Sequence, residues 1–409
     1  MLKFIGITTL LALALGCHAR EAGAPDLPEV RLELADADLW GATRGIYAHP
    51  EERGKTWERP ARLGWFAPGG ESWSTDVGVR IHGGRSRALE QKSFRVYFDH
   101  GDGVIQRDLF GDGPARFARV IVRSVQTPAR CLHTHVAESL FQDLGHLGSR
   151  LQPVTVVLNG RPWGIYSLRE RFDDDFVRET LDHAGPFDLI RDGETEHGDG
   201  QGWLDFLAAV AAPADRSSAA WLAGVEAQFD LAGYMDWLII NIVGAAADNG
   251  GPHNVSLLRL ADGPWRVLMW DEDDLFQPDN LRNDHWRWFA AADEVEYRRY
   301  QPPVQITGTW QTRAPWAALF RGLLENPVFR ERFFARADEL LAGELSVVRF
   351  AERVQRVVAL HEPAIAAHAE RWGWESPQDL HDHAAVVLAW YAERHGVVSE
   401  QLESFRAQW

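Results

Sequence analysis

The periodicity of the apolar residues changes along this 409-residue chain, and the change limits the folds it can adopt. In the first half, short segments such as VRLEL at 30–34 and KSFRVYF at 92–98 alternate apolar and polar residues, as half-buried strands do. Residues 127–144 have helical spacing with Pro128 in the first turn. From Phe229 onward the pattern is mostly helical. The sequence therefore predicts an α+β protein with an N-terminal sheet-rich lobe and a C-terminal mostly helical lobe.

The composition sets outer limits on function. Hydrophobic residues make up 45% of the chain, which is enough for a substantial core. The formal net charge is −17, and no stripe of Lys and Arg offsets it, so we expect no nucleic-acid partner. The 18 tryptophans are expected to pack the core, with a sugar-stacking surface as the alternative.

The N-terminus has the pattern of a targeting segment. A basic residue, an apolar stretch at 4–15 and the small-residue sequence ALGC ending at Cys17 resemble a bacterial lipoprotein signal peptide, after whose removal Cys17 is acylated. We therefore expect a signal peptide at 1–16, a tether at 17–28, and a membrane-anchored protein outside the cytoplasm. A secretory cut after Ala19 is the alternative. The other cysteine, Cys131, is expected to be a buried core thiol without a disulfide partner.

A basic turn and strand at 82–98 have the residues that an anion site needs. The glycines of HGGRS at 82–86 let backbone N–H groups approach an anion, and Arg85, Ser86 and Lys92 can contribute side-chain donors. The motif matches neither a Walker loop nor the glycine-rich loop of kinases. The alternative for Lys92 is an ordinary solvated charge.

Two glutamates are candidates for supporting this site. Glu138 lies on the predicted helix 127–144, and Glu170 follows the predicted strand GIYSL at 164–168. A surface helix charge is the alternative interpretation of Glu138. For Glu170 the alternative is an ion pair with a neighbouring arginine, since such pairs are common and weak.

A polar loop follows the apolar helix predicted at 234–244. It carries Asp248, and Asn254 comes six residues later, with Asn249 as a second candidate amide ligand. A plain surface turn at Asp248-Asn249-Gly250 is the alternative.

An acidic cluster follows the predicted strand at 265–270. If the strand continues through Asp271 and Asp273, the two carboxylates lie on one face and Glu272 points away. Magnesium takes one or two protein carboxylates plus phosphate oxygens, so this pattern suits it, while Mn²⁺ or Ca²⁺ remain alternatives. An acidic turn without a metal is the other interpretation.

Together these motifs resemble the CotH family of atypical, protein-kinase-like proteins. The resemblance rests on VRIHGGRSRALEQKSFRVYF at 79–98, VTVVLNGRPWGIYSLRERFD at 154–173, and the run from FDLAGYMDWLIINIVGAAADN through HNVSLLR to WRVLMWDEDDLF, at 229–276. It implies an atypical two-lobed protein-kinase-like fold, with a core at 29–310 and a helical region at 311–409 packed on it.

The resemblance also implies a reaction and roles for the candidate residues. The reaction is metal-dependent transfer of a phosphoryl group from ATP to Ser or Thr hydroxyls of a protein substrate. Asp248 would be the base, and Mg²⁺ would be held by Asp271, Asn254 and Asp273. The nucleotide would be bound or supported by Lys92, Arg85, Ser86, Glu138 and Glu170. Free ATP is scarce outside a bacterial cytoplasm, so the alternatives are another phosphorylated donor, or an inactive surface-binding, adhesion or assembly protein on a kinase-like scaffold.

Overall fold

The computed structural model describes residues 27–409 apart from 213–214, 250, 262, 306–307 and 375. The predicted signal peptide at 1–16, the lipidation site Cys17 and nearly all of the predicted tether at 17–28 lie outside the described residues. Within the described part of the chain, no helix has both the length and the apolar composition to cross a membrane.

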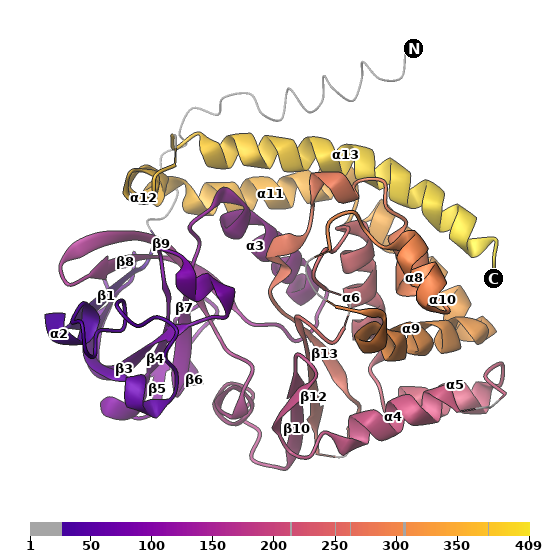
Figure 1. The fold of residues 1–409 in the computed structure, drawn as a ribbon, viewed down its shortest axis with the longest axis horizontal. Coiled ribbons are helices and arrows are strands. Elements are labelled where there is room, and N and C mark those ends of the chain that lie inside the picture. Colours follow the sequence, from indigo (N-terminus) through magenta and orange to yellow (C-terminus); the bar gives the residue numbers. More distant parts are fainter. Residues whose placement is uncertain (1–26, 213–214, 250, 262, 306–307, 375) are drawn as a thin grey trace.

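The N-terminal sheet closes into a barrel with the strand order β1-β2-β3-β4-β7-β9-β8 (Figure 1). Its neighbouring strands are antiparallel except β8 and β1, whose parallel pairing completes the closure. The sequence predicted a sheet-rich lobe, and the closure was not expected. The barrel strands are β1 (Glu29–Leu34), β2 (Arg59–Phe66), β3 (Ser72–His82), β4 (Ser93–Tyr97), β7 (Arg119–Ser124), β8 (Leu151–Leu158) and β9 (Arg161–Arg169).

The predicted alternation along these strands fills the barrel. Val79 on β3, Phe94 on β4 and Val122 on β7 are fully buried in one apolar cluster inside it. Because successive side chains of a strand point to opposite faces, the residues between them face outward. The outer face therefore carries the polar positions of the same segments.

A second, four-stranded antiparallel sheet has the order β11-β10-β12-β13. In Figure 1 it lies between the barrel and the helices α4 and α6. A separate two-stranded sheet pairs β5 with β6. These strands are β5 (Ile105–Arg107), β6 (Ala115–Phe117), β10 (Phe187–Arg191), β11 (Glu194–His197), β12 (Val255–Leu260) and β13 (Arg266–Met269).

The helices other than α2 share one large apolar core with α3, whereas Leu39 of α2 belongs to the apolar cluster of the barrel. In Figure 1, α11 and α13 run side by side across the top of the molecule, and α12 packs against β9 of the barrel. The helices are α2 (Asp36–Leu39), α3 (Pro128–Asp143), α4 (Gln201–Ala211), α5 (Ala219–Glu226), α6 (Leu231–Val243), α7 (His285–Phe289), α8 (Glu294–Tyr300), α9 (Trp310–Glu325), α10 (Pro327–Ala342), α11 (Val347–His361), α12 (Ile365–Trp372) and α13 (Asp379–Arg406).

Helix α3 forms where the sequence predicts it. Pro128 occupies its first turn, where a missing N–H costs nothing, and the Thr127 hydroxyl accepts a hydrogen bond from Arg130 N at 3.4 Å. Cys131 is buried, as predicted, and its Sγ donates to Val125 O.

Four tryptophans are fully buried in the large apolar core, as the sequence predicted for this residue type. They are Trp237, Trp265, Trp286 and Trp288. The mixed α+β class is confirmed. The two-lobed kinase-like arrangement remains a prediction, as does the boundary between 29–310 and 311–409, which falls at the start of α9.

Candidate functional site

A cavity of about 640 Å³ opens where the barrel meets the four-stranded sheet. Its walls come from the β3–β4 turn, the outer face of the barrel, the segment after β9, and the loops that follow α6 and β13. Eight arginines and five aspartates are among the described residues that line it. The cavity therefore suits a strongly charged ligand, with cationic and anionic groups drawn from different parts of the chain.

The strand register places arginines on the cavity wall of the barrel. His82 pairs with Ser93, Arg95 pairs with Ile121, and Arg123 follows two residues after Ile121 on the same face of β7. His82, Arg95 and Arg123 all line the cavity. Successive side chains of a strand point to opposite faces of the sheet. The apolar side chains of these strands therefore fill the barrel, and the arginines between them face the cavity.

The β3–β4 turn forms the rim of the cavity. Gly83 has φ 114°, a conformation that L side chains rarely adopt. Arg87 holds the backbone of this turn, because its guanidinium donates to Gly83 O at 2.6 Å and to Ile81 O at 2.8 Å. The turn thus presents Arg85 and Ser86 to the cavity, where the sequence predicted a phosphate contact.

Lys92 does not line the cavity. It is buried, and its Nζ donates to Arg87 O at 2.8 Å and to Leu89 O at 3.0 Å. Burial lowers the pKa of Lys92 against the opposing influence of Glu51 and Glu90. In this conformation Lys92 holds the backbone of the turn that follows β3.

Glu138 lies at the centre of the contacts between α3 and the acidic loop. It is 1% exposed, forms an ion pair with Arg169, and accepts a hydrogen bond from Asp271 N at 3.0 Å. Burial raises the pKa of Glu138 to about 7, although Arg169 and Arg123 act in the opposite direction. Glu138 is therefore not a surface charge, and it fixes the backbone at Asp271.

Arg123 is the basic residue that meets the acidic cluster. Its guanidinium forms an ion pair with Asp271 and lies 3.3 Å from Asp273 Oδ2. Strand β7 directly precedes α3, which carries Glu138. In protein kinases a strand lysine and a helix glutamate occur in this order. Arg123, and not Lys92, has the corresponding place along the chain.

Glu170 is also held away from the cavity. Its carboxylate accepts from Arg150 N at 3.0 Å and from Arg150 Nη2 at 2.7 Å, and it is 2% exposed. It does not line the cavity, so any influence on a ligand there would be indirect. The ion-pair interpretation matches this geometry, with Arg150 as the partner.

The loop after α6 brings Asp248 and Asn254 together. Asn254 Nδ2 donates to Asp248 Oδ2 at 3.3 Å and to Asp271 O at 3.3 Å. These bonds use the amide nitrogen and leave the amide oxygen as the atom that can bind a metal. Asn249 is 2% exposed and does not line the cavity, whereas Asn254 does. His253 Nε2 lies 3.4 Å from Asp248 Oδ2, and this contact raises the pKa of His253.

Strand β13 ends at Met269 and does not continue through the acidic cluster. Asp271 has φ 63° and begins the short helical turn Glu272–Asp274, so the strand register that would place alternate residues on one face does not apply. Asp271 and Asp273 nevertheless both line the cavity. Glu272 does not line the cavity and is fully buried.

The acidic loop carries more negative charge than its arginines balance. Burial and Asp271 raise the pKa of Asp273 to about 6, and burial and Asp273 raise that of Asp274 to about 7. At Asp271, burial acts to raise the pKa, but Arg123 outweighs it and the pKa is lowered. Carboxylate and amide oxygens with excess negative charge fit a hard divalent cation.

Comparison with known proteins identifies the family. The model of the CotH kinase protein family matches residues 79–398. This chain belongs to that family. No curated protein matches the sequence significantly. The family match covers both the barrel strands from β3 onward and most of the C-terminal helices, so the cavity of this CotH protein is built entirely within the matched region, apart from Arg53.

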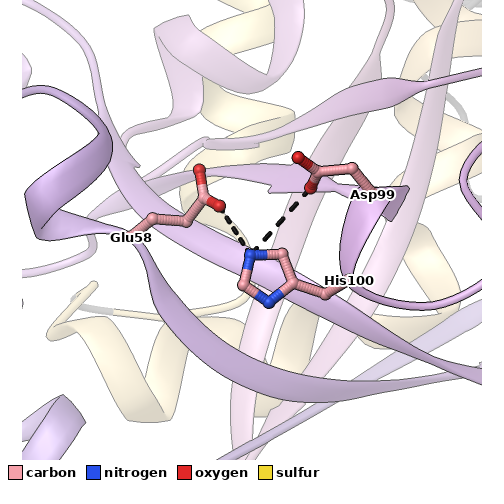
Figure 2. Close-up of side chains that lie close together, drawn as sticks. All are labelled: Glu58, Asp99 and His100. Carbon is pink, nitrogen blue, oxygen red and sulfur yellow. Dashed lines mark hydrogen bonds and ion pairs between the residues drawn. The ribbon is translucent and has the colours of Figure 1, made fainter.

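Other acidic groups of this CotH protein lie outside the cavity. Glu58, Asp99 and His100 bring their ligand atoms within 4.8 Å of one another (Figure 2), as do Asp173, Asp174 and Asp175. The described acids of the cavity do not form such a group. Magnesium sites of phosphoryl-transfer enzymes take several ligands from the phosphates themselves, so wider spacing of the protein ligands fits that metal.

Sequence reasoning missed several residues that line the cavity. They are Arg95, Arg123, Arg130, Arg171, Arg191, His253 and Asp274. For Arg123 a pattern was available, because the strand segment ARVIVRS at 118–124 comes directly before the predicted helix 127–144. For Arg171 and Arg191 no local pattern distinguishes them from surface arginines.

Proposed function

We propose that this CotH protein transfers a phosphoryl group from a metal-bound nucleoside triphosphate, with ATP as the reference donor, to a Ser or Thr hydroxyl of a protein. The observation that carries the proposal is one cavity lined by Asp248, Asn254, Asp271, Asp273 and Arg123. Their order along the chain, with Glu138 between Arg123 and Asp248, is the order of the corresponding parts in protein kinases. Membership of the CotH kinase family supports the same class of transferase.

The residues suit a divalent metal. Asp271, Asp273 and the amide oxygen of Asn254 would hold Mg²⁺, and Mn²⁺ or Ca²⁺ are alternatives for the same oxygen ligands. When bound, the metal supplies neutralisation of the charge that develops on the transferred phosphoryl group. Glu138 keeps the backbone of Asp271 in place through its hydrogen bond to Asp271 N.

The chain's own residues account for binding and proton transfer. Arg123, Arg85 and Ser86 line the cavity and would bind the phosphates, while Lys92 maintains the turn that presents the last two. Asp248 would orient the acceptor hydroxyl and accept its proton. The hydroxyl oxygen forms a bond to the γ-phosphorus, and the bond from that phosphorus to the β–γ bridging oxygen breaks.

The proposal includes a location outside the cytoplasm, on a membrane, through a lipid on Cys17, with secretion after removal of the signal peptide as the alternative. The sequence at 1–17 is its only support. Metabolic labelling with a fatty-acid analogue tests it: wild-type protein should carry the label, and Cys17→Ser should not. Label retained in Cys17→Ser contradicts it.

The test of the reaction is transfer of label from γ-³²P-ATP to protein in the presence of Mg²⁺. Wild-type chain should label itself or an added protein mixture, and Asp248→Asn and Asp271→Asn should lose at least about 100-fold of that rate. Asp279→Asn is the matched control, because Asp279 is an exposed acid near the same loop that does not line the cavity. Equal labelling by wild type and both site variants would contradict the proposal and favour a binding role.

A further inference from the structure

The composition of the cavity lining bears on what the donor must look like. Of the described residues that line the cavity, only Phe172 and Trp270 have large apolar side chains. Pockets that recognise a flat organic group such as a nucleobase are lined mainly by apolar and aromatic side chains. This lining is instead dominated by guanidinium and carboxylate groups.

The two aromatic side chains are already in contact with protein. Phe172 is 1% exposed and packs edge to face on Trp270, with ring centroids 5.7 Å apart. The guanidinium of Arg169 lies 4.2 Å over the ring of Trp270. Stacking of a base needs an open aromatic face, and Arg169 covers one face of Trp270, which is the less buried of the two rings.

Apart from Arg53, Arg85 and Arg87, the arginines that line the cavity form two groups. Arg123 and Arg130 face the acids, since Arg130 Nη2 lies 3.5 Å from Asp273 Oδ2, and Arg87 is occupied by backbone carbonyls. Arg95 and Arg191, with Arg171, form the second group, which we call the arginine subsite. It draws on β4, β10 and the segment after β9.

The three members of the arginine subsite differ in their anionic partners. Arg95 forms no ion pair with any described residue, and its buried Nε has no hydrogen-bond partner. Arg171 and Arg191 both bind Glu196, and Arg171 also pairs with Asp173 at 2.9 Å; neither acid lines the cavity, whereas Asp192, next to Arg191, does. Arg95 therefore lines the cavity without an ion-pair partner among the described residues, and an anion in the cavity would balance its charge.

The electrostatics of the subsite agree with this geometry. Burial, and next to it repulsion by Arg171, lower the pKa of Arg95, and the same two causes lower that of Arg191 to about 10. His82 lies beside Arg95, with 3.0 Å from Arg95 Nη2 to His82 Nδ1. Burial and Arg95 lower the pKa of His82 well below its usual value, so at neutral pH its Nδ1 accepts and its Nε2 carries the proton.

We infer that the donor is recognised by its phosphates and not by a base, and that the arginine subsite binds further phosphates of a linear oligophosphate chain. The inference rests on the proposed function for the location of the transferred phosphoryl group, at the acidic end of the cavity. ATP remains a donor under this inference, but its adenosine contributes little to affinity. A chain longer than three phosphates gains contacts with Arg95, Arg171 and Arg191.

Calorimetric titration of the full chain in Mg²⁺ tests the inference with ATP, GTP, CTP, inorganic tripolyphosphate, a longer linear polyphosphate and adenosine. We expect the three nucleotides and tripolyphosphate to bind within about threefold of one another, and the longer chain to bind about tenfold more tightly, as one or two charge-assisted contacts provide. Adenosine should not bind.

Arg95→Gln and Arg191→Gln should remove the advantage of the longer chain and leave tripolyphosphate affinity within about threefold. Arg266→Gln, an exposed arginine on β13 outside the cavity, is the control for the loss of one charge. Thermal unfolding checks that the variants fold; Arg95→Gln loses hydrogen bonds to His82 Nδ1 and Tyr97 Oη but no ion pair, so only a small loss of stability is expected.

The outcomes separate this inference from the proposed function. ATP binding at least about tenfold more tightly than tripolyphosphate and the other nucleotides overturns the inference and leaves the proposed function standing. A longer-chain advantage that survives both arginine variants overturns the role of the arginine subsite. Absence of binding by every phosphate ligand overturns both.

Discussion

Two clusters of charged residues in this protein have similar compositions and different surroundings. In the Glu58 cluster, defined here as Glu58, Asp99 and His100 with Lys55 and Arg80, the Glu58 carboxylate accepts from Arg80 Nε at 2.8 Å, from Lys55 Nζ at 2.6 Å and from His100 Nε2 at 2.6 Å (Figure 2). A cation entering there would have to displace charges that are already satisfied.

The acidic loop of the cavity, Asp271 to Asp274, is the opposite case. Among the described residues, Arg123 and Arg130 form its ion pairs, and both Asp273 and Asp274 have raised pKa values. The comparison shows that close spacing of acids is a poor guide to a ligand site. Unbalanced charge at a cavity is the better guide, because it is what a bound cation or phosphate corrects.

The largest expected effects are on the rate of phosphoryl transfer, which should depend on the acidic loop and not on the Glu58 cluster. Asp271→Asn should lower phosphoryl transfer at least about 100-fold, because it removes a charged metal ligand and the partner of Arg123. Glu58→Gln should leave the rate per folded molecule within about threefold, since Glu58 does not line the cavity. Rate measurements at matched folded fractions check this. An equal loss in both variants would show that the comparison is wrong.

A second comparison concerns the two basic residues proposed for phosphate. Arg123→Met should weaken binding of the metal–nucleotide complex about 10- to 100-fold, because one charge-assisted contact is lost. Lys92→Met should keep the affinity within about threefold. It should lower the free energy of unfolding by about 1–2 kcal/mol, because Arg87 O and Leu89 O lose their donor. Titration and chemical unfolding of both variants measure the contrast. Lys92→Met with full stability and lost affinity would restore Lys92 as a direct ligand.

The Glu58 cluster should matter for stability. Glu58→Gln is expected to cost about 1–3 kcal/mol, because Arg80 and Lys55 lose charged hydrogen bonds. Added Mg²⁺ should change the unfolding of this variant as much as that of wild type. Denaturant unfolding with and without Mg²⁺ measures both. A magnesium effect that disappears in Glu58→Gln would make this cluster a metal site.

The smallest expected effects are opposite pH dependences. Burial would raise the pKa of Glu58, but Lys55, His100 and Arg80 outweigh it and lower the pKa, so its stabilisation is present above the normal glutamate range and is lost as the pH falls through the lowered value. The raised pKa values of Asp273 and Asp274 stabilise the fold at low pH, and this contribution is lost as the pH rises through about 6 to about 7.

Asp274→Asn should therefore flatten the stability profile between pH 5 and 8 by about 1 kcal/mol or less, since water reaches this carboxyl. Glu58→Gln should flatten the profile only at about pH 4 and below. Unfolding free energies measured across pH 3–8 test the pair. A profile in which both variants change the same pH range would contradict the assigned pKa directions.

The sequence predicts the individual helices and strands of this fold better than it predicts the closure of the barrel. Helix α3 begins and ends within one residue of the predicted range, because Pro128 and Thr127 mark its start locally. The barrel closes through parallel pairing of β1 with β8, whose partners Val30 and Val156 are far apart in sequence. No local pattern encodes that pairing.

The site shows the same limit. Asp248, Asn254, Asp271 and Asp273 were found because they follow apolar elements in a recognisable order, and the structure brings all four to one cavity. The sequence predicted Lys92 as the phosphate contact, and Arg123 was not a candidate, although its strand β7 directly precedes α3. Arg171 and Arg191 could not be found at all, because only the meeting of the barrel with the second sheet makes them neighbours.

The most direct test of the central claim, that the cavity binds a metal and phosphates together, is thermal unfolding of the purified chain with Mg²⁺ and ATP separately and in combination. We expect stabilisation by the combination, about 2.7 kcal/mol at a hundred times the dissociation constant. It should be lost in Asp271→Asn and retained in Glu58→Gln. Stabilisation by metal alone that survives Asp271→Asn, or no stabilisation by the combination, would contradict the claim.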